Sequence, residues 1–215
     1  GFSLIANFMK SKGIDQTTWL NDSDPQPERR ISPYFRPTRL SSAVTYEIPV
    51  GRGKRVNLRS RLLDLIAGGW QTTGTYTFQV GGPLMWVNGS TNNPGDYVYF
   101  GGKLDSNPRG VNGTAFNTRL FDTAPANQFQ YHIRTFSTAF ADVRADGIND
   151  WAASMLKRFR LGERSFVQLR VESFNFINHA AFGAANTTAT NSAFGTITSQ
   201  ANRPRTFQLV ARIVF

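Results

Sequence analysis

Hydrophobic and polar residues alternate along six stretches of this chain. In residues 40–50, for example, Leu40, Val44 and Tyr46 lie on one side of the alternation, and Thr45 and Glu47 lie on the other. A period of two places successive side chains on opposite faces of a strand, so each stretch is predicted to be a β-strand with one apolar face. The predicted strands are residues 2–9, 40–50, 70–80, 149–160, 165–173 and the final stretch 205–215, "RTFQLVARIVF".

The connections between these strands are alternately long and short. Residues 12–36, 81–147 and 179–203 are long and polar, whereas 51–54 (GRGK) and 161–164 (LGER) are tight turns. After GRGK, apolar residues recur at helical spacing and stop at Gly68-Gly69, which predicts a short helix ended by glycine. These apolar residues are Leu58, Leu62, Leu65 and Ile66.

Strand length and loop order together indicate a membrane barrel. About ten residues suffice for a tilted strand to cross a bilayer. In outer-membrane barrels the periplasmic turns are short and the extracellular loops long, whereas a soluble β-sandwich has no reason to sort its loops by side. The sequence therefore predicts an all-β fold, about six C-terminal strands of a larger antiparallel transmembrane β-barrel. Residues 81–147 are expected to form a structureless extracellular loop.

Composition narrows the class further. Among the 215 residues are 18 Phe, 6 Tyr and 4 Trp, which supply ample surface to bury and argue against disorder. Mean hydropathy is −0.33, and no run approaches the roughly 18 apolar residues of a membrane helix. The chain has no cysteine, which excludes disulfide scaffolds, thiolate metal sites and cysteine nucleophiles.

The last strand carries a signal of its own. Apolar residues occupy every second position up to an aromatic end, and this pattern resembles the C-terminal assembly signal of outer-membrane β-barrels. The resemblance implies that the barrel-assembly machinery recognises this strand, which then closes the barrel. Closure matters because an open edge in lipid leaves backbone groups unpaired. The closing-strand candidates are Phe207, Leu209, Ala211, Ile213 and Phe215.

Four longer stretches resemble one family in particular. They are "YEIPVGRGKR" (46–55), "GGWQTTGTYTFQVGGPL" (68–84), "LKRFRLGERSFVQLRVESFNFINHAAFG" (156–183) and "FGTITSQANRPRTFQLVARIVF" (194–215). They look like the end of TonB-dependent outer-membrane transporters of the Oar-like kind, which carry a carboxypeptidase-regulatory-like domain at the N-terminus. An E-x-F-N-x-x-N-H pattern falls where that family places its penultimate strand and the following loop; its residues are Glu172, Phe174, Asn175, Asn178 and His179.

The resemblance implies a many-stranded barrel that takes up a bulky nutrient, such as a chelate, glycan or peptide, when the TonB complex pulls on an N-terminal plug. Residues 1–215 are then expected to be the C-terminal part of the barrel domain, with the plug and the remaining strands upstream. Six strands are too few to close, since single-chain bacterial barrels start at eight. The outer membrane of a Gram-negative bacterium is the expected location, and its lipid and lipopolysaccharide are expected partners.

Polar and aromatic positions on the strands are candidates for two barrel surfaces. Lumen-facing candidates are Gln168, Arg170, Glu172, Gln208 and Arg212. Either an electropositive path for an anionic substrate or a salt-bridged, wet lumen wall accounts for them. Candidates for the interfacial aromatic girdles are Tyr46, Trp70, Trp151 and Phe159. Basic residues near the membrane ends are expected to meet lipid phosphates; they are Arg29, Arg30, Arg36 and Arg39 outside, and Arg52, Lys54 and Arg55 inside.

No enzyme active site is predicted, and no cofactor or metal is implied. The two histidines, His132 and His179, are not paired with carboxylates at ligand spacing. The acidic stretches 21–28 and 146–150 lack the spacing of an EF-hand, although a calcium site in the loops stays open as an alternative.

Three rival classes share some of these features. The net charge of +10 fits nucleic-acid binding, but the basic residues are dispersed and no nucleic-acid-binding motif is present. A soluble β-sandwich that binds glycans would share the alternation and the aromatic-rich loops. A plugless porin or an adhesin would keep the barrel without the transport.

Overall fold

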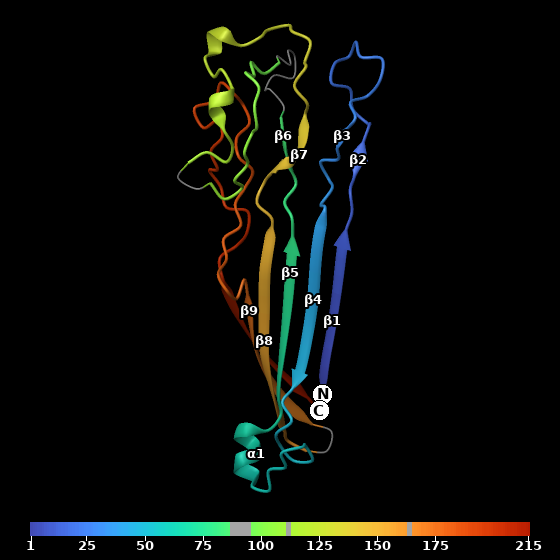
Figure 1. Ribbon diagram of the computed structural model, residues 1–215. Helices are drawn as coiled ribbons and strands as arrows, with labels where there is room; N and C mark the ends of the chain where they lie inside the picture. Colours follow the sequence, from blue (N-terminus) through green and yellow to red (C-terminus); the bar gives the residue numbers. More distant parts are fainter. Residues whose placement is uncertain (87–95, 111–112, 163–164) are drawn as a thin grey trace.

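A computed structural model describes residues 1–86, 96–110, 113–162 and 165–215 of the chain. Six long antiparallel strands form one sheet in the order β1-β4-β5-β8-β9-β10, and neighbouring strands are consecutive along the chain apart from short strands in the connections (Figure 1). The long strands are β1 (Phe2–Lys10), β4 (Thr38–Glu47), β5 (Trp70–Gln79), β8 (Ile148–Arg160), β9 (Phe166–Phe174) and β10 (Thr206–Val214).

All six predicted strands are present, and their ends differ by a few residues. The largest difference is in β4, which ends at Glu47 rather than at Val50. Pro49 has no amide hydrogen to donate to a ladder, and Val50 instead forms an isolated bridge with Val56. Phe215 lies just past the end of β10, so the apolar alternation continues one residue beyond the hydrogen-bonded strand.

The connections are sorted between the two ends of the sheet as predicted. The described residues of the connections 11–37, 80–147 and 175–205 lie at the upper end in Figure 1, whereas those of 48–69 and 161–165 lie at the lower end. The turn LGER falls partly on residues 163–164, which lie outside the described part of the chain. By the loop-length rule, the upper end is extracellular and the lower end periplasmic.

The predicted helix is present in the lower connection. Helix α1 (Arg61–Ala67) begins after Ser60, whose hydroxyl accepts a hydrogen bond from the Leu63 amide at 3.4 Å. It ends at Gly68, whose amide donates to the Asp64 carbonyl at 2.9 Å. Gly69 has φ +72°, and a Cβ there would lie 2.6 Å from the Arg158 carbonyl oxygen. The glycine pair therefore both ends the helix and lets the chain pass close to β8.

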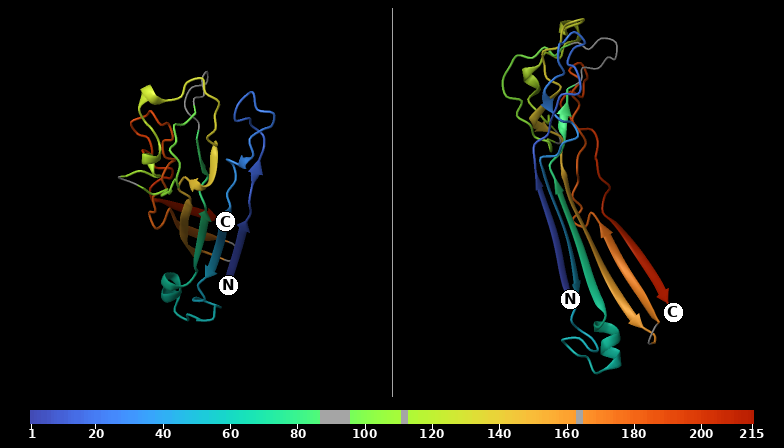
Figure 2. Two further views of the ribbon diagram at one scale, coloured as in Figure 1. Left: turned by 45° about the horizontal axis from the view of Figure 1, so that its top comes forward. Right: turned by 90° about the vertical axis from the view of Figure 1, so that its right-hand side faces the viewer.

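The long sheet is a single curved layer (Figure 2). Among the described residues no second sheet covers either of its faces, and β1 and β10 are its two edges. Large apolar side chains stay exposed on it, for example Phe8 at 67% and Leu209 at 80%. The soluble β-sandwich is therefore wrong, because a sandwich would bury such side chains between two layers. No helix in the described ranges is long and apolar enough to cross a membrane.

The expectation of a structureless loop at 81–147 is also wrong. This segment contains β6 (Pro83–Met85) paired with β7 (Ala139–Arg144), and two short 3-10 helices, η1 (Thr118–Leu120) and η2 (Pro125–Asn127). In the connection 11–37, β2 (Ile14–Asp15) pairs with β3 (Arg30–Ile31). The upper end is therefore a folded part of the molecule with its own core.

Candidate functional site

The register of the sheet separates two faces. Across neighbouring strands, Leu40 pairs with Phe78, Tyr76 with Trp151, and Val171 with Leu209, which defines the apolar face. The polar face carries the alternate positions, where the Thr73 and Ser154 hydroxyls lie 2.6 Å apart. A barrel wall in lipid requires this division, because its outer surface meets acyl chains and its inner surface meets water.

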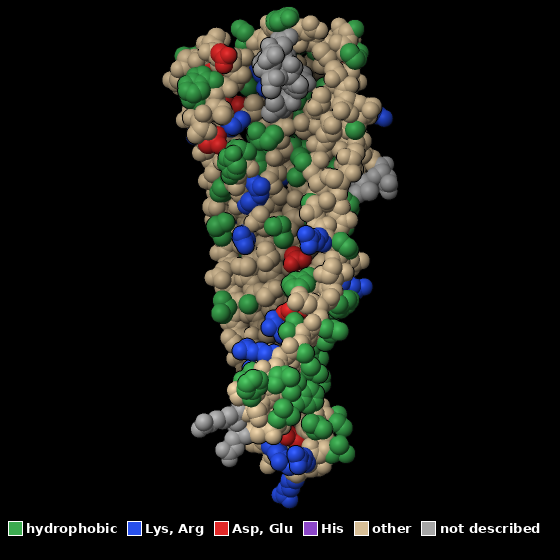
Figure 3. Space-filling view, turned by 180° about the vertical axis from the view of Figure 1, so that it is seen from behind, with side chains coloured by type: hydrophobic (Ala, Val, Ile, Leu, Met, Phe, Trp, Pro, Cys, Tyr) green, Lys and Arg blue, Asp and Glu red, His purple; other side chains and the backbone are tan. Residues whose placement is uncertain are grey.

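The five lumen-facing candidates all lie on the polar face. Gln168 pairs with Arg212 across β9 and β10, and Glu172 pairs with Gln208. The Arg170 guanidinium donates to the Glu172 carboxylate two residues along the same strand. Of the two candidate arginines, Arg170 thus has a carboxylate partner, as a salt-bridged lumen wall requires. Figure 3 shows Lys and Arg side chains spaced along the length of the molecule, with hydrophobic side chains gathered toward the lower end.

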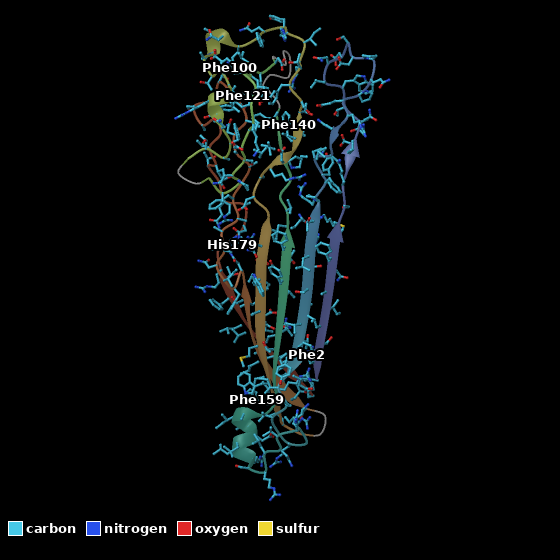
Figure 4. All side chains as sticks on the ribbon, viewed as in Figure 1. Phe2, Phe100, Phe121, Phe140, Phe159 and His179 are labelled. Atoms are coloured by element: carbon cyan, nitrogen blue, oxygen red, sulfur yellow. The ribbon has the colours of Figure 1, made fainter. Side chains whose placement is uncertain are left out.

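The aromatic candidates lie on the apolar face at two levels. Trp151 stacks on Tyr76, with ring centroids 4.2 Å apart, near the extracellular end of β8. Tyr46, Trp70 and Phe159 lie near the periplasmic ends of their strands. Phe159 is labelled beside α1 in Figure 4, with Phe2 at a similar level. These two levels are where the aromatic girdles of a membrane barrel are found.

Four of the five closing-strand candidates lie on the apolar face of β10, and the fifth, Phe215, lies just past the end of the strand. Phe207, Leu209 and Ile213 are 65%, 80% and 65% exposed on β10. Phe215 is fully exposed beyond the end of the strand. These side chains therefore present an uncovered apolar row along an edge of the sheet.

A buried aromatic cluster holds the upper connections together, and the sequence reading did not anticipate it. Trp86 is completely buried, and its ring lies 4.8 Å from that of Phe116 and 5.4 Å from those of Phe121 and Phe136, centroid to centroid. Phe194, from the last connection, packs on Phe116 at 5.3 Å. We call the described residues of 80–147 and 175–205 the extracellular body, since one core joins them. Phe121 and Phe140 are labelled within it in Figure 4.

Asp96 is the buried polar centre of this body. Its carboxylate is 1% exposed and accepts hydrogen bonds from the Thr135 amide at 2.8 Å, the Thr135 hydroxyl at 2.6 Å and the Phe136 amide at 3.1 Å. Burial alone would raise the pKa of Asp96, but these bonds and one from the Tyr97 amide outweigh it, so the pKa lies below its ordinary value. The carboxylate therefore stays charged and fixes residues 135 and 136 beside the aromatic cluster.

The first connection is joined to the body by side-chain hydrogen bonds. Asn21 exchanges two of them with the Arg134 backbone, at 2.6 and 3.0 Å. The Glu28 carboxylate accepts from the Ser137 hydroxyl at 2.6 Å, and from the Thr138 amide at 3.0 Å and hydroxyl at 2.6 Å. The acidic stretch 21–28 is thus used to join two connections. Within the described residues no group of three or more His, Cys, Asp or Glu side chains could hold a metal ion.

Asp146 lies where the body joins the strands. Its carboxylate accepts from the Arg109 guanidinium at 2.6 Å and from the Phe182 amide at 3.0 Å. Arg109 also donates to the Ala180 carbonyl at 3.0 Å and lies 3.2 Å from Nε2 of His179. The stretch 146–150 and one histidine therefore lie at a contact between two extracellular connections.

The E-x-F-N-x-x-N-H pattern has a structural explanation in the turn after β9. Asn175 and Asn178 both have left-handed backbone, with φ +48° and +54°, a conformation that asparagine tolerates better than most residues. The buried Asn175 amide donates to the carbonyls of His179 and Arg203, at 3.0 and 3.1 Å, and its oxygen accepts from the His179 amide at 2.8 Å. Asn175 thereby closes the base of the loop that leads to β10.

A cavity of about 710 Å³ opens below the body, where the connections meet the strands. From the polar face of the sheet, Thr77, Gln79 and Asp150 line it, and Arg36 and Phe182 contribute from two different connections. Its volume falls in the range of small-molecule sites, which is about 300–1,000 Å³. The lining combines both charges with apolar surface, which suits a ligand that has polar groups on an apolar frame.

Residues 1–208 match the family model described as outer membrane beta barrel domain, and the chain belongs to this family. The protein is therefore an outer-membrane β-barrel protein. No curated protein is significantly similar to it, and no solved structure is either.

Proposed function

We propose that the protein carries out energised, TonB-dependent uptake of a bulky nutrient, such as a chelate, glycan or peptide. The observation that carries the proposal is the cavity of about 710 Å³ between the extracellular body and the polar face of the sheet. A passive pore requires an open entrance, whereas a transporter for scarce ligands requires a binding site that holds the ligand before it enters the lumen. The resemblance of 46–55, 68–84, 156–183 and 194–215 to Oar-like transporters supports the same proposal.

The folding of the extracellular connections adds to this support. The cavity is lined by residues of three upper connections, and these are joined to one another by the Glu28–Thr138 and Asp146–Phe182 hydrogen bonds. Such fixed connections can hold a ligand with little ordering cost on binding. The proposal includes no catalytic step.

Energised uptake can be tested in the native host. A strain that lacks the gene is compared with wild type for growth on single chelates, glycans or peptides as the limiting nutrient. We expect a defect on one nutrient, and the same defect after disruption of TonB or collapse of the proton gradient. Uptake that survives loss of TonB would overturn energised transport and leave a porin.

The cavity itself can be tested with matched variants of the intact protein. Thr77→Trp would fill it, whereas Thr75→Trp places the same side chain on the same face of β5, away from the lining. We expect Thr77→Trp to raise the half-saturating concentration for uptake, because the ligand loses space in its site, and Thr75→Trp to leave it close to wild type. An equal effect of both variants would place ligand recognition elsewhere.

A further inference from the structure

Helix α1 exposes its apolar residues at the periplasmic end of the molecule. Leu62, Leu63, Leu65 and Ile66 are 65%, 54%, 51% and 63% exposed, and none of the helix is buried. A connection in water would not gain from four exposed aliphatic side chains within five residues, because apolar surface is stabilised by removal from water. An apolar environment outside the protein would account for them.

The helix is held on the apolar side of the sheet. Trp70 and Lys157 are paired neighbours on the apolar face of β5 and β8. The Trp70 indole donates to the Ile66 carbonyl at 2.9 Å, and the Lys157 ammonium donates to the Ile66 carbonyl at 3.0 Å and to the Gly68 carbonyl. The last turn of α1 is thereby fixed to the edge of the surface that meets lipid. Figures 1 and 4 show α1 at the lower end, and Phe159 is labelled beside it in Figure 4.

The connection that contains α1 is strongly basic. Residues 48–69 hold five basic side chains and one acidic side chain, Asp64. Lys54 is paired with Glu47 at 2.6 Å. Arginine accounts for the other four, and all four are exposed and without an ion pair to another residue of the described ranges; they are Arg52, Arg55, Arg59 and Arg61. Arginine matches phosphate in geometry and charge.

We propose that α1 lies in the periplasmic leaflet of the outer membrane, with its leucines and Ile66 at the acyl boundary and the four arginines at anionic phospholipid headgroups. Two observations favour lipid over a periplasmic protein as the partner that contacts α1. The apolar residues of α1 continue the lipid-facing surface of the sheet through Trp70 and Lys157, and the surrounding charge has the sign that attracts anionic lipid. Interfacial helices combine an apolar surface with Lys and Arg in this way. The proposal does not depend on transport.

Lipid contact can be measured with single cysteines introduced into the intact protein; these 215 residues contain no cysteine, and any cysteine elsewhere is first replaced by serine. Leu65→Cys carries an environment-sensitive fluorophore on the helix, and Asn57→Cys carries it in the same connection, at an exposed polar position outside α1. Each protein is reconstituted in phosphatidylethanolamine–phosphatidylglycerol vesicles that contain a lipid-borne quencher. We expect at least about threefold stronger lipid quenching at position 65, because interfacial helices bury their apolar face below the headgroups. Equal lipid quenching, with equal access of aqueous iodide, would overturn the proposal.

The role of the arginines is tested in the same assay. Arg59→Glu combined with Arg61→Glu is expected to lower lipid quenching at position 65 in the phosphatidylglycerol vesicles and to change it little in phosphatidylcholine vesicles. Arg119→Glu reverses the charge of an exposed arginine at the opposite end, and we expect it to have no effect. An identical effect of the double variant in both lipids would overturn headgroup recognition. Shielding of position 65 from iodide in native membranes, combined with no lipid quenching in the vesicles, would assign the helix to a periplasmic protein instead.

Discussion

The ammonium nitrogen of Lys157 lies 3.0 Å from the carbonyl oxygen of Ile66 and so joins the apolar face of β8 to the last turn of α1. The Lys157 side chain is 4% exposed and lies 4.9 Å from the Trp70 ring centroid and 5.3 Å from that of Phe159. A lysine on a lipid-facing surface is costly unless its charge reaches the interface. Here the long side chain extends to the periplasmic end, where helix carbonyls accept its hydrogen bonds.

We predict that Lys157→Met loosens α1 and leaves the sheet intact. Hydrogen bonds from a charged donor contribute about 1.5–3 kcal/mol each, and methionine keeps the apolar packing without the donor. Amide hydrogen exchange at residues 65–69 should accelerate, with little change in the strands. Lys54→Met is the control, because it removes a lysine whose ion pair lies outside the helix. Unchanged exchange at residues 65–69 in Lys157→Met would contradict the role assigned to Lys157.

A second prediction concerns the aromatic core of the extracellular body. Trp86→Ala should destabilise the body by about 3–5 kcal/mol, the usual cost of removing a large buried aromatic side chain. Limited proteolysis of whole cells should then cleave residues 96–147 faster, while the sheet keeps its heat-modifiable migration on gels. Phe100→Ala is the matched control, since Phe100 is 67% exposed. Equal cleavage of the two variants would contradict a core centred on Trp86.

The strands could be predicted because one physical demand acts on every residue of a barrel wall. Each side chain faces either lipid or water, so the period of two is visible without knowledge of partners. The ends were less exact, as in β4, where Pro49 interrupts the ladder before the apolar alternation stops. The end of α1 could also be predicted, because the left-handed backbone at Gly69 requires glycine and this requirement is visible in the local sequence.

The extracellular body could not be predicted, because its core joins residues of irregular backbone. Trp86, Phe121 and Phe194 pack together from positions that follow no period. The bond between Glu28 and Thr138 links residues far apart in sequence, and the acidic stretch 21–28 gave no sign of its partner. For Lys157 a signal did exist, since it interrupts an apolar alternation near the end of a strand.

The lowered pKa of Asp96 leads to a third prediction. A carboxyl whose pKa is lower in the folded state adds stability above its unfolded pKa, near 3.9, and loses it as the pH falls through the folded value. Near-UV circular dichroism of the aromatic cluster should therefore show thermal stability that is constant near neutral pH and falls below about pH 4.

The contribution of Asp96 is isolated by comparison with Asp96→Asn. This variant should be less stable than wild type at pH 7, and the difference between the two should shrink as the pH falls below about 4. Asp105→Asn changes an aspartate whose side chain is 66% exposed, and we expect it to leave the transition near that of wild type. A difference between Asp96→Asn and wild type that stays constant down to pH 2 would show that the Asp96 charge does not stabilise the body.

A fourth prediction concerns assembly. Deleting Phe215 from the intact protein should lower its level in the outer membrane, because the exposed apolar row of β10 would lose its terminal aromatic residue. Phe215→Tyr keeps an aromatic ring at the end and should assemble nearly as well as wild type. The measurement is the amount of heat-modifiable protein in isolated outer membranes at equal expression. An unchanged level after the deletion would show that assembly into the outer membrane does not depend on Phe215.

The two faces of β10 can be compared directly with one substitution at adjacent positions. Leu209→Arg places a charge on the apolar face, where an arginine near the bilayer midplane costs about 2–4 kcal/mol. Gln208→Arg places the same charge on the polar face, opposite Glu172, where water and a carboxylate accommodate it. Unfolding of the intact protein in lipid vesicles by denaturant should therefore show a lower free energy for Leu209→Arg and a value near wild type for Gln208→Arg. If Gln208→Arg instead had the lower free energy of unfolding, the assignment of the two faces would be wrong, and the lumen would lie on the side that carries Leu209.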